Sequence, residues 1–139
     1  MSRLMSVSHT TKAVRARTKT ETRRLGWWTD RNGRRLVNVG DTLTLCEKVM
    51  GRRHACTACD PGHYCGTCCG FGDVVDPLVR ICDVTVTDVR RERLCDITAE
   101  GVAAEGFPDW SPGEFVSFFC DTFGTHDATL LTVLAWEYL

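Results

Sequence analysis

The chain has 139 residues, of which 43% are hydrophobic and 25% are charged, and this predicts one globular domain over residues 1–139 with a single core. No apolar run reaches the roughly 18 residues that a membrane-spanning helix needs, and the first residues lack the apolar stretch of a secretory signal. We therefore expect a cytoplasmic protein without a membrane partner. The oligomeric state stays open, with a monomer slightly favoured.

The net charge of −1 conceals an uneven distribution of charges along the chain. Residues 1–54 contain 13 of the 17 Lys and Arg residues but only 4 of the 18 acidic residues. Two interpretations stay open. The basic and acidic parts pair with one another in the fold, or the basic part attracts RNA, a nucleoside or a nucleotide.

Short elements open the chain. Alternation within residues 1–9 predicts a strand, and residues 13–17 predict a short helix. Residues 42–50 predict the next strand, because apolar and polar side chains alternate there. Residues 51–76 are rich in Gly, Cys and His and lack periodicity, so we interpret them as an insertion between two strands.

Residues 19–24, between this helix and the next strand, have the sequence Lys-Thr-Glu-Thr-Arg-Arg. One amine, two hydroxyls, one carboxylate and two guanidiniums within six residues exceed what a solvated surface needs. Two hypotheses stay open: the segment binds a phosphate-bearing ligand, or Lys19 and Thr22 react with one. Because successive side chains of a strand point to opposite faces, we expect Glu21 and Arg23 to face outward.

Trp27 and Trp28 directly follow the basic segment. One interpretation is that these rings pack in the core or cover the end of a barrel. The other is that they form a platform on which a nucleobase stacks. The basic residues beside them add some support to this alternative, although packing is the more common role of such rings.

Four cysteines of the insertion form two Cys-x-x-Cys pairs, Cys56 with Cys59 and Cys65 with Cys68. Paired thiolates suit tetrahedral zinc, and four protein ligands would make the zinc structural, since no position stays open for water. The gap between the pairs is shorter than in zinc ribbons. A reduced loop tip without metal and a redox or iron–sulfur site are therefore the alternatives.

The longest strand signal covers residues 78–89, where the alternation slips by one residue near Cys82 and predicts a β-bulge or bend. Thr98 is the predicted N-cap of a short helix over residues 99–105, which Gly106 ends.

Two elements close the chain. Ser111 and Glu114 form a capping box around Pro112 and predict the start of a helix that runs to Gly124. Residues 129–139 are apolar on both faces, which predicts a strand inside a sheet and not at its edge. A few strands with short helices predict a small α+β fold built on a β-barrel.

Several of these segments, in this order, resemble the ASCH domain, a relative of the PUA fold. Residues 19–24 are similar to the family signature G-x-K-x-x-T-x-R, with Arg17 at the glycine position. Further likenesses are a GD turn at residues 39–43, a long central strand at 84–94, an IT…EGF helix at 97–107 and a closing strand at 136–139. The resemblance covers most of the chain outside residues 51–76, and it extends especially to small ASCH proteins encoded by actinobacterial phages.

The resemblance implies an α+β, PUA-like β-barrel with short helices and a cleft that is associated with RNA or nucleosides, in the host cytoplasm if the chain is phage-encoded. Some ASCH proteins are similar to amidohydrolases that act on N(4)-acetylcytidine, and others to ribonucleases; a non-catalytic RNA-binding module is the alternative to an enzyme. The amidohydrolase pattern places catalytic roles on Lys19, Thr22 and Glu105. The candidate residues for binding nucleic acid or phosphate are Arg23, Arg24, Trp27 and Trp28.

The implied chemistry is coherent. A threonine hydroxyl is a weak nucleophile and needs a base, and a lysine whose pKa is lowered by burial and neighbouring cations can supply one. Glu105 would orient Lys19 or assist the leaving amine.

Overall fold

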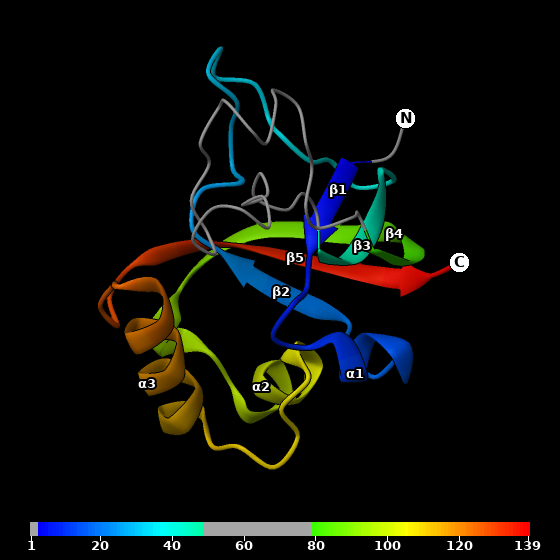
Figure 1. The fold of residues 1–139 in the computed structure, drawn as a ribbon. Coiled ribbons are helices and arrows are strands. Elements are labelled where there is room, and N and C mark those ends of the chain that lie inside the picture. The colour runs from blue at the N-terminus through cyan, green and yellow to red at the C-terminus, as the bar shows by residue number, and fades with distance from the viewer. Residues whose placement is uncertain (1–2, 49–78) are drawn as a thin grey trace, which may run out of the picture.

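The computed structural model describes residues 3–48 and 79–139 (Figure 1). The predicted insertion and its cysteines Cys56, Cys59, Cys65 and Cys68 lie outside the described residues. The elements in chain order are β1 (Arg3–Ser6), α1 (Thr11–Arg15), β2 (Glu21–Arg24), β3 (Thr42–Lys48), β4 (Val79–Arg93), the 3-10 turn η1 (Leu94–Asp96), α2 (Ala99–Glu105), α3 (Pro112–Phe123) and β5 (Leu130–Tyr138).

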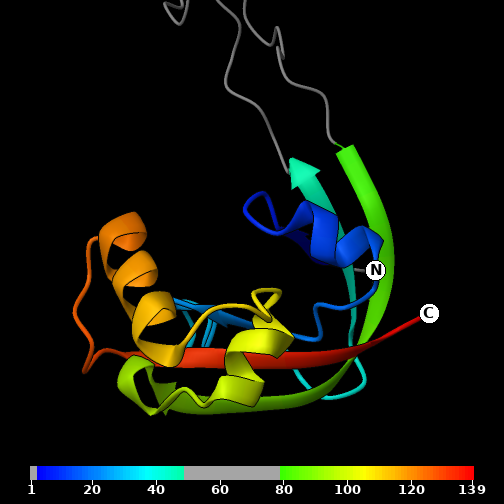
Figure 2. The same cartoon turned by 90° about the horizontal axis from the view of Figure 1, so that it is seen from below.

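The five strands form one mixed sheet in the order β1-β3-β4-β5-β2. β1 and β3 are parallel, and the other neighbouring pairs are antiparallel. Figure 2 shows the long strands curving through half a barrel, with the helices on the inner side of the curve. The predicted α+β class is confirmed, and within the described residues the sheet is an open half-barrel whose edges are β1 and β2.

Strand β4 bends because it contains two irregularities. Cys82 pairs with Leu45 and Arg80 pairs with Cys46, the next residue of β3. Ile81 of β4 therefore lies between the two pairs as the extra residue of a bulge. A second shift in the pairing with β5 lies at Thr87. Bulges of this kind bend a strand and increase its twist, and the predicted slip in the alternation is therefore confirmed. The bend lets one strand pair with β3 at its start and with β5 at its end.

Strand β5 lies inside the sheet, as predicted, because it pairs with β4 on one side and β2 on the other. Two apolar clusters flank this sheet. The first lies around β1, α1 and β3, and the second lies between β5, η1, α2 and α3. The fully buried members of the first include Met5, Val14, Leu43, Leu45 and Val84; the second consists of Leu94, Ile97, Val102, Phe115, Phe119 and Leu131.

The later helices follow their predicted caps. The side chain of Thr98 accepts a hydrogen bond from the backbone of Gly101, and α2 ends at Gly106, whose φ of 109° suits glycine. Ser111 and Glu114 form the predicted capping box of α3. Helix α1 differs from its prediction, since it ends at Arg15.

None of the helices in the two described ranges combines the length and the apolar character that crossing a membrane requires.

Candidate functional site

A pocket of about 240 Å³ lies between β2, the end of α2 and one face of α3. One wall is polar and contains the side chains of the basic segment together with Glu105. The facing wall is aromatic, and residues 6–10 close the remaining side. The lining residues of the polar wall are Lys19, Thr22, Arg23, Arg24 and Glu105, and those of the aromatic wall are Phe107, Phe115, Phe118, Phe119 and Phe123.

Lys19 and Glu105 form a buried ion pair at the centre of the polar wall. The lysine Nζ donates to Oε1 of Glu105 at 2.8 Å and to the backbone oxygen of the same residue at 2.6 Å. Lys19 is only 2% exposed. Burial lowers the pKa of Lys19 below its ordinary value of 10.5, Glu105 opposes this effect, and the charges of Arg24 and Arg23 lower the pKa further.

The backbone of Lys19 is held by the last strand. Its carbonyl oxygen accepts hydrogen bonds from Nε1 of Trp136, at 3.1 Å, and from the hydroxyl of Tyr138. Its amide donates to the carbonyl of Ala13 in α1. Strand β5 and helix α1 therefore fix where the lysine side chain starts, and this pre-organises the amine.

Thr22 and Arg24 contact each other on β2, as expected for residues two apart on a strand. Nε of Arg24 donates to the Thr22 hydroxyl oxygen at 3.2 Å, and the same guanidinium donates to the carbonyl of Ser6 beside the other edge of the sheet. Thr22 is 3% exposed. Burial lowers the pKa of Arg24, with Glu105 opposing. The hydroxyl oxygen of Thr22 thus accepts a hydrogen bond from a cation and keeps its own proton to donate.

The expectation that Glu21 and Arg23 face outward is wrong. Arg23 is only 4% exposed, and its Nη1 lies 3.2 Å from Glu21 and 3.4 Å from Glu105. Its Nη2 lies 3.1 Å from Glu92 on β4. The reason is that α2 packs against β2, so the side chains turned away from Thr22 also enter the interior.

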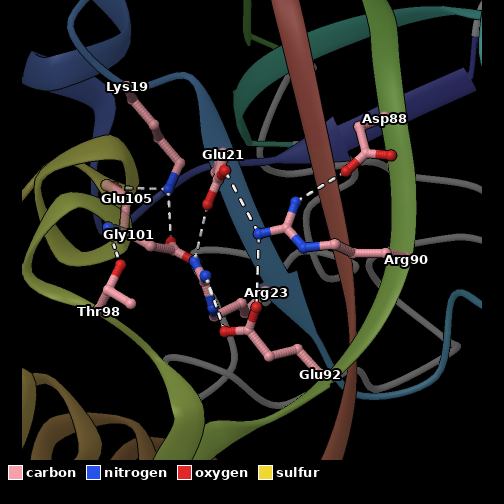
Figure 3. A network of polar contacts seen from close by, with 9 residues as sticks. All are labelled: Lys19, Glu21, Arg23, Asp88, Arg90, Glu92, Thr98, Gly101 and Glu105. Carbon is pink, nitrogen blue, oxygen red and sulfur yellow. Dashed lines mark hydrogen bonds and ion pairs between the residues drawn. The ribbon is translucent and has the colours of Figure 1, made fainter.

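The ion pairs continue from Arg23 toward the surface (Figure 3). Arg90 contacts Glu21 at 3.5 Å, Glu92 at 3.4 Å and Asp88 at 2.8 Å. Side chains of Arg90 and Asp88 are 37% and 50% exposed, whereas that of Arg23 is 2% exposed. A chain of alternating charges therefore leads from the pocket to solvent.

Trp27 and Trp28 are absent from the residues that line this pocket. Trp27 packs against the first apolar cluster. The guanidinium of Arg35 lies 3.6 Å from the ring centroid of Trp28, and that of Arg91 lies 5.0 Å from it. Neither tryptophan therefore lines the pocket that contains Lys19, and the base-stacking role stays a prediction about a different surface.

The residue at the glycine position of the signature has an unusual backbone. Arg17 has a φ of 61°, in the left-handed region that glycine adopts most easily. A glycine would adopt this conformation at little cost, and here an arginine adopts it. Its guanidinium lies over the ring of Tyr138, 5.7 Å from the centroid.

The aromatic wall is not predicted from the sequence. Phe115, Phe118 and Phe119 lie three and four residues apart, which places them on one face of α3. That spacing signals a buried helix face, but it does not tell which element the face meets. His9 adds a ring at the edge of Phe118, with a centroid distance of 5.9 Å.

The residues that the structure describes contain no cluster of three His, Cys, Asp or Glu side chains that could hold a metal ion. The zinc hypothesis concerns Cys56, Cys59, Cys65 and Cys68, which lie outside those residues, so it stays a prediction.

Two solved structures are similar to this chain. The first is a DUF984 protein from Enterococcus faecalis V583, which is 14% identical with a TM-score of 0.60, and the match covers 100% of this chain and 80% of that one. The second is an ASCH domain from Lactobacillus crispatus JV V101, also 14% identical, with a TM-score of 0.52 and coverage of 98% and 79%. No family model and no curated protein matches the sequence.

At this level of identity the likeness shows the fold. The chain has an ASCH-type, PUA-like α+β fold, as the sequence resemblance implies. Both similar proteins come from bacteria, and the resemblance to phage proteins stays a prediction.

Proposed function

We propose that the chain is an ASCH-type hydrolase that binds a nucleoside in this pocket and removes an acyl group from the exocyclic nitrogen of its base, as in N(4)-acetylcytidine. One observation carries the proposal: Lys19, Thr22 and Glu105 line the same small pocket, with the lysine amine 2.8 Å from the carboxylate. The ASCH-type fold agrees with it.

The dimensions of the pocket support a small substrate. Its volume of about 240 Å³ lies just below the roughly 300–1,000 Å³ of typical sites for drug-sized ligands. The phenylalanine rings offer a flat ring a surface for stacking, and the opposite wall offers hydrogen-bond donors. A single base with its sugar suits this shape better than a folded RNA.

In the first half of the reaction, Oγ of Thr22 attacks the acyl carbonyl carbon while the neutral amine of Lys19 takes the hydroxyl proton. The bond between the acyl carbon and the exocyclic nitrogen then breaks, and protonated Lys19 gives the proton to the leaving nitrogen. Arg24, which donates to the Thr22 hydroxyl oxygen, stabilises the negative charge that this oxygen carries as its proton passes to Lys19. Glu105 holds the lysine in place.

In the second half, a water molecule attacks the ester on Thr22 and Lys19 takes the proton of this water. The ester bond breaks, the carboxylic acid leaves, and Thr22 regains its hydroxyl proton from Lys19. Each proton that Lys19 takes is returned within the same half, so the lysine ends the cycle neutral.

The direct test is incubation of the full chain with N(4)-acetylcytidine and measurement of released acetate. Thr22→Ala should abolish release, whereas the matched variant Thr22→Ser, which keeps a hydroxyl, should retain part of it. Loss of release in Lys19→Met would support the role of the base. Failure of the wild-type chain to hydrolyse any of a panel of acylated nucleosides would overturn the proposal.

A second candidate is a non-catalytic RNA- or nucleoside-binding module, or a ribonuclease. The observation that supports this candidate is a group of exposed arginines in the loop between β2 and β3, namely Arg31, Arg34 and Arg35. Binding through phosphate contacts should weaken steeply as salt rises, because counterions are released. RNA binding that persists when acetate release is absent would favour this candidate, and RNA cleavage that Lys19→Ala abolishes would favour the ribonuclease.

A further inference from the structure

The carboxylate of Glu105 is shared between two cations. Its Oε1 faces Lys19 at 2.8 Å, and its Oε2 faces Arg23 at 3.4 Å. Figure 3 shows the carboxylate between the two side chains. The side chains of Lys19 and Arg23 are each 2% exposed, and that of Glu105 is 6% exposed, so water screens these interactions little. A change in one cation must therefore alter how the carboxylate serves the other.

Arg23 is built into its position. Glu21 and Glu92 accept from its two terminal nitrogens at 3.2 and 3.1 Å. A Cβ atom at Gly101 would lie only 3.0 Å from Nη2, so the glycine in α2 leaves room for the guanidinium. Nε of Arg23 is buried and has no hydrogen-bond partner among the described residues. The ion pairs of its terminal nitrogens with Glu21, Glu92 and Glu105 therefore hold the guanidinium in place.

We propose that Arg23 is a positioning residue of the site. By binding one oxygen of Glu105, it directs the other oxygen to the Lys19 amine and weakens the hold of the carboxylate on the lysine proton. The proposal rests on the proposed function, in which Lys19 must lose a proton to act as a base.

The charges around Lys19 fix the sign of the expected effect. Glu105 on α2 faces its amine, and Arg23 and Arg24 approach it from β2, while His9 lines the same pocket. Burial lowers the pKa of Lys19, Glu105 raises it, and both arginines lower it. If a neutral residue replaces Arg23, one influence that lowers the pKa of Lys19 disappears. The Glu105 carboxylate then interacts with Lys19 without a competing interaction with Arg23. Both changes favour the protonated amine, and the pKa of Lys19 must rise.

Removal of the charge of Glu92 should have the opposite effect. Glu92 compensates the charge of Arg23 from β4. Without this carboxylate, Arg23 binds Glu105 more strongly and its charge is less balanced, so the pKa of Lys19 must fall. A purely structural role for Arg23 gives no reason for two shifts of opposite sign.

The chain contains three lysines, Lys12, Lys19 and Lys48, so the titration of Lys19 can be followed by NMR on protein with ¹³C-labelled lysine. Lys12 serves as the exposed reference. We expect Arg23→Gln to move the Lys19 titration up by about one pH unit and Glu92→Gln to move it down. The matched control is Arg15→Gln, which removes an exposed arginine that pairs with Glu47 and should leave the Lys19 titration in place.

Acetate release from N(4)-acetylcytidine should follow the same order, with the rising limb of its pH–rate profile shifted up in Arg23→Gln and down in Glu92→Gln. An unchanged Lys19 titration in Arg23→Gln overturns the role of Arg23, even if the wild-type chain is active. Conversely, shifted titrations in a chain that hydrolyses no acylated nucleoside overturn the proposed function and leave the role of Arg23 standing. If Arg23→Gln does not fold, Glu92→Gln decides: a fall in the Lys19 titration supports the proposal, and no change overturns it.

Discussion

Lys19 and Glu105, separated by 86 positions in the sequence, form an ion pair at 2.8 Å in which the two side chains are 2% and 6% exposed. The pair joins the segment before β2 to the end of α2. Such a pair affects stability as well as chemistry, because a buried charge that loses its partner keeps its desolvation penalty.

We predict that, at a pH below the Lys19 titration where the amine is protonated, Glu105→Gln lowers the free energy of unfolding by about 3–5 kcal/mol, since it leaves this charge buried without a counter-charge. Urea unfolding followed by circular dichroism measures the change. The matched control is Glu47→Gln, which breaks an ion pair whose side chains are 55% and 45% exposed and should cost less than about 1 kcal/mol. Similar losses in both variants would contradict the prediction.

Stability should also depend on pH through Lys19. The pKa of Lys19 in the folded chain lies below 10.5. Between the lowered pKa and 10.5, the unfolded chain binds a proton that the folded chain has released, so the free energy of unfolding rises with pH. This contribution is complete above 10.5 and is lost as the pH falls through the folded pKa.

Lys19→Met removes the titrating group, and the rise in stability with pH in that window should be smaller in this variant than in the wild-type chain. Urea unfolding at a series of pH values from neutral to alkaline measures the difference between the two slopes, in which the cysteines and tyrosines common to both chains cancel. Parallel curves for the two chains would contradict the lowered pKa.

Gly101→Ala should destabilise the chain, although alanine is the better helix former by about 1 kcal/mol. The new Cβ would lie 3.0 Å from both Nη2 of Arg23 and Cγ1 of Ile97, and overpacking of this kind costs about 1–3 kcal/mol. Thermal unfolding measures the effect. Gly113→Ala in α3 is the matched control, because the nearest atom there is Oγ of Ser111 at 3.9 Å. This control should be neutral or stabilising, and a loss equal to that of Gly101→Ala would refute the steric explanation.

Arg17→Gly should stabilise the folded chain by about 0.5–1 kcal/mol, since a side chain in the left-handed region costs about 1–2 kcal/mol and Arg17 has a φ of 61°. The gain is reduced by the loss of the contact between its guanidinium and the ring of Tyr138. Arg17→Ala loses the same contact without relieving the backbone, so its melting temperature should fall. A glycine variant that melts no higher than the alanine variant would show that the backbone conformation carries no strain.

The sequence predicts those features of the fold that depend on residues close together in the chain. The caps at Thr98 and Ser111 and the slip near Cys82 are local signals, and the structure confirms all three. The α+β class follows from the same elements in order. The sequence predicts that α1 continues to Arg17, whereas it ends at Arg15. Nothing in the sequence indicates that Arg17 adopts a left-handed backbone conformation, because arginine rarely does so.

The candidate site was predicted in part. The structure brings together Lys19, Thr22 and Glu105 in one pocket, as the family resemblance implies. The burial of Arg23 could not be predicted, because it depends on α2 packing over β2, a contact between segments about 80 positions apart. The same reason applies to the aromatic wall, since the sequence shows that a helix face is apolar but not what the face meets.

The pairing of β3 with β4 continues to Lys48 and Val79, the two positions that border residues 49–78. Neighbouring strands lie about 4.8 Å apart, so two residues would be enough to close this hairpin. The pairing of these strands therefore does not require a connection of any particular length. The polar wall is formed by residues 19–24 and by Glu105 at the end of α2, and neither segment is joined directly to this connection. Shortening the chain between Lys48 and Val79 should therefore leave the pairing of β3 with β4 and the described residues of the polar wall in place.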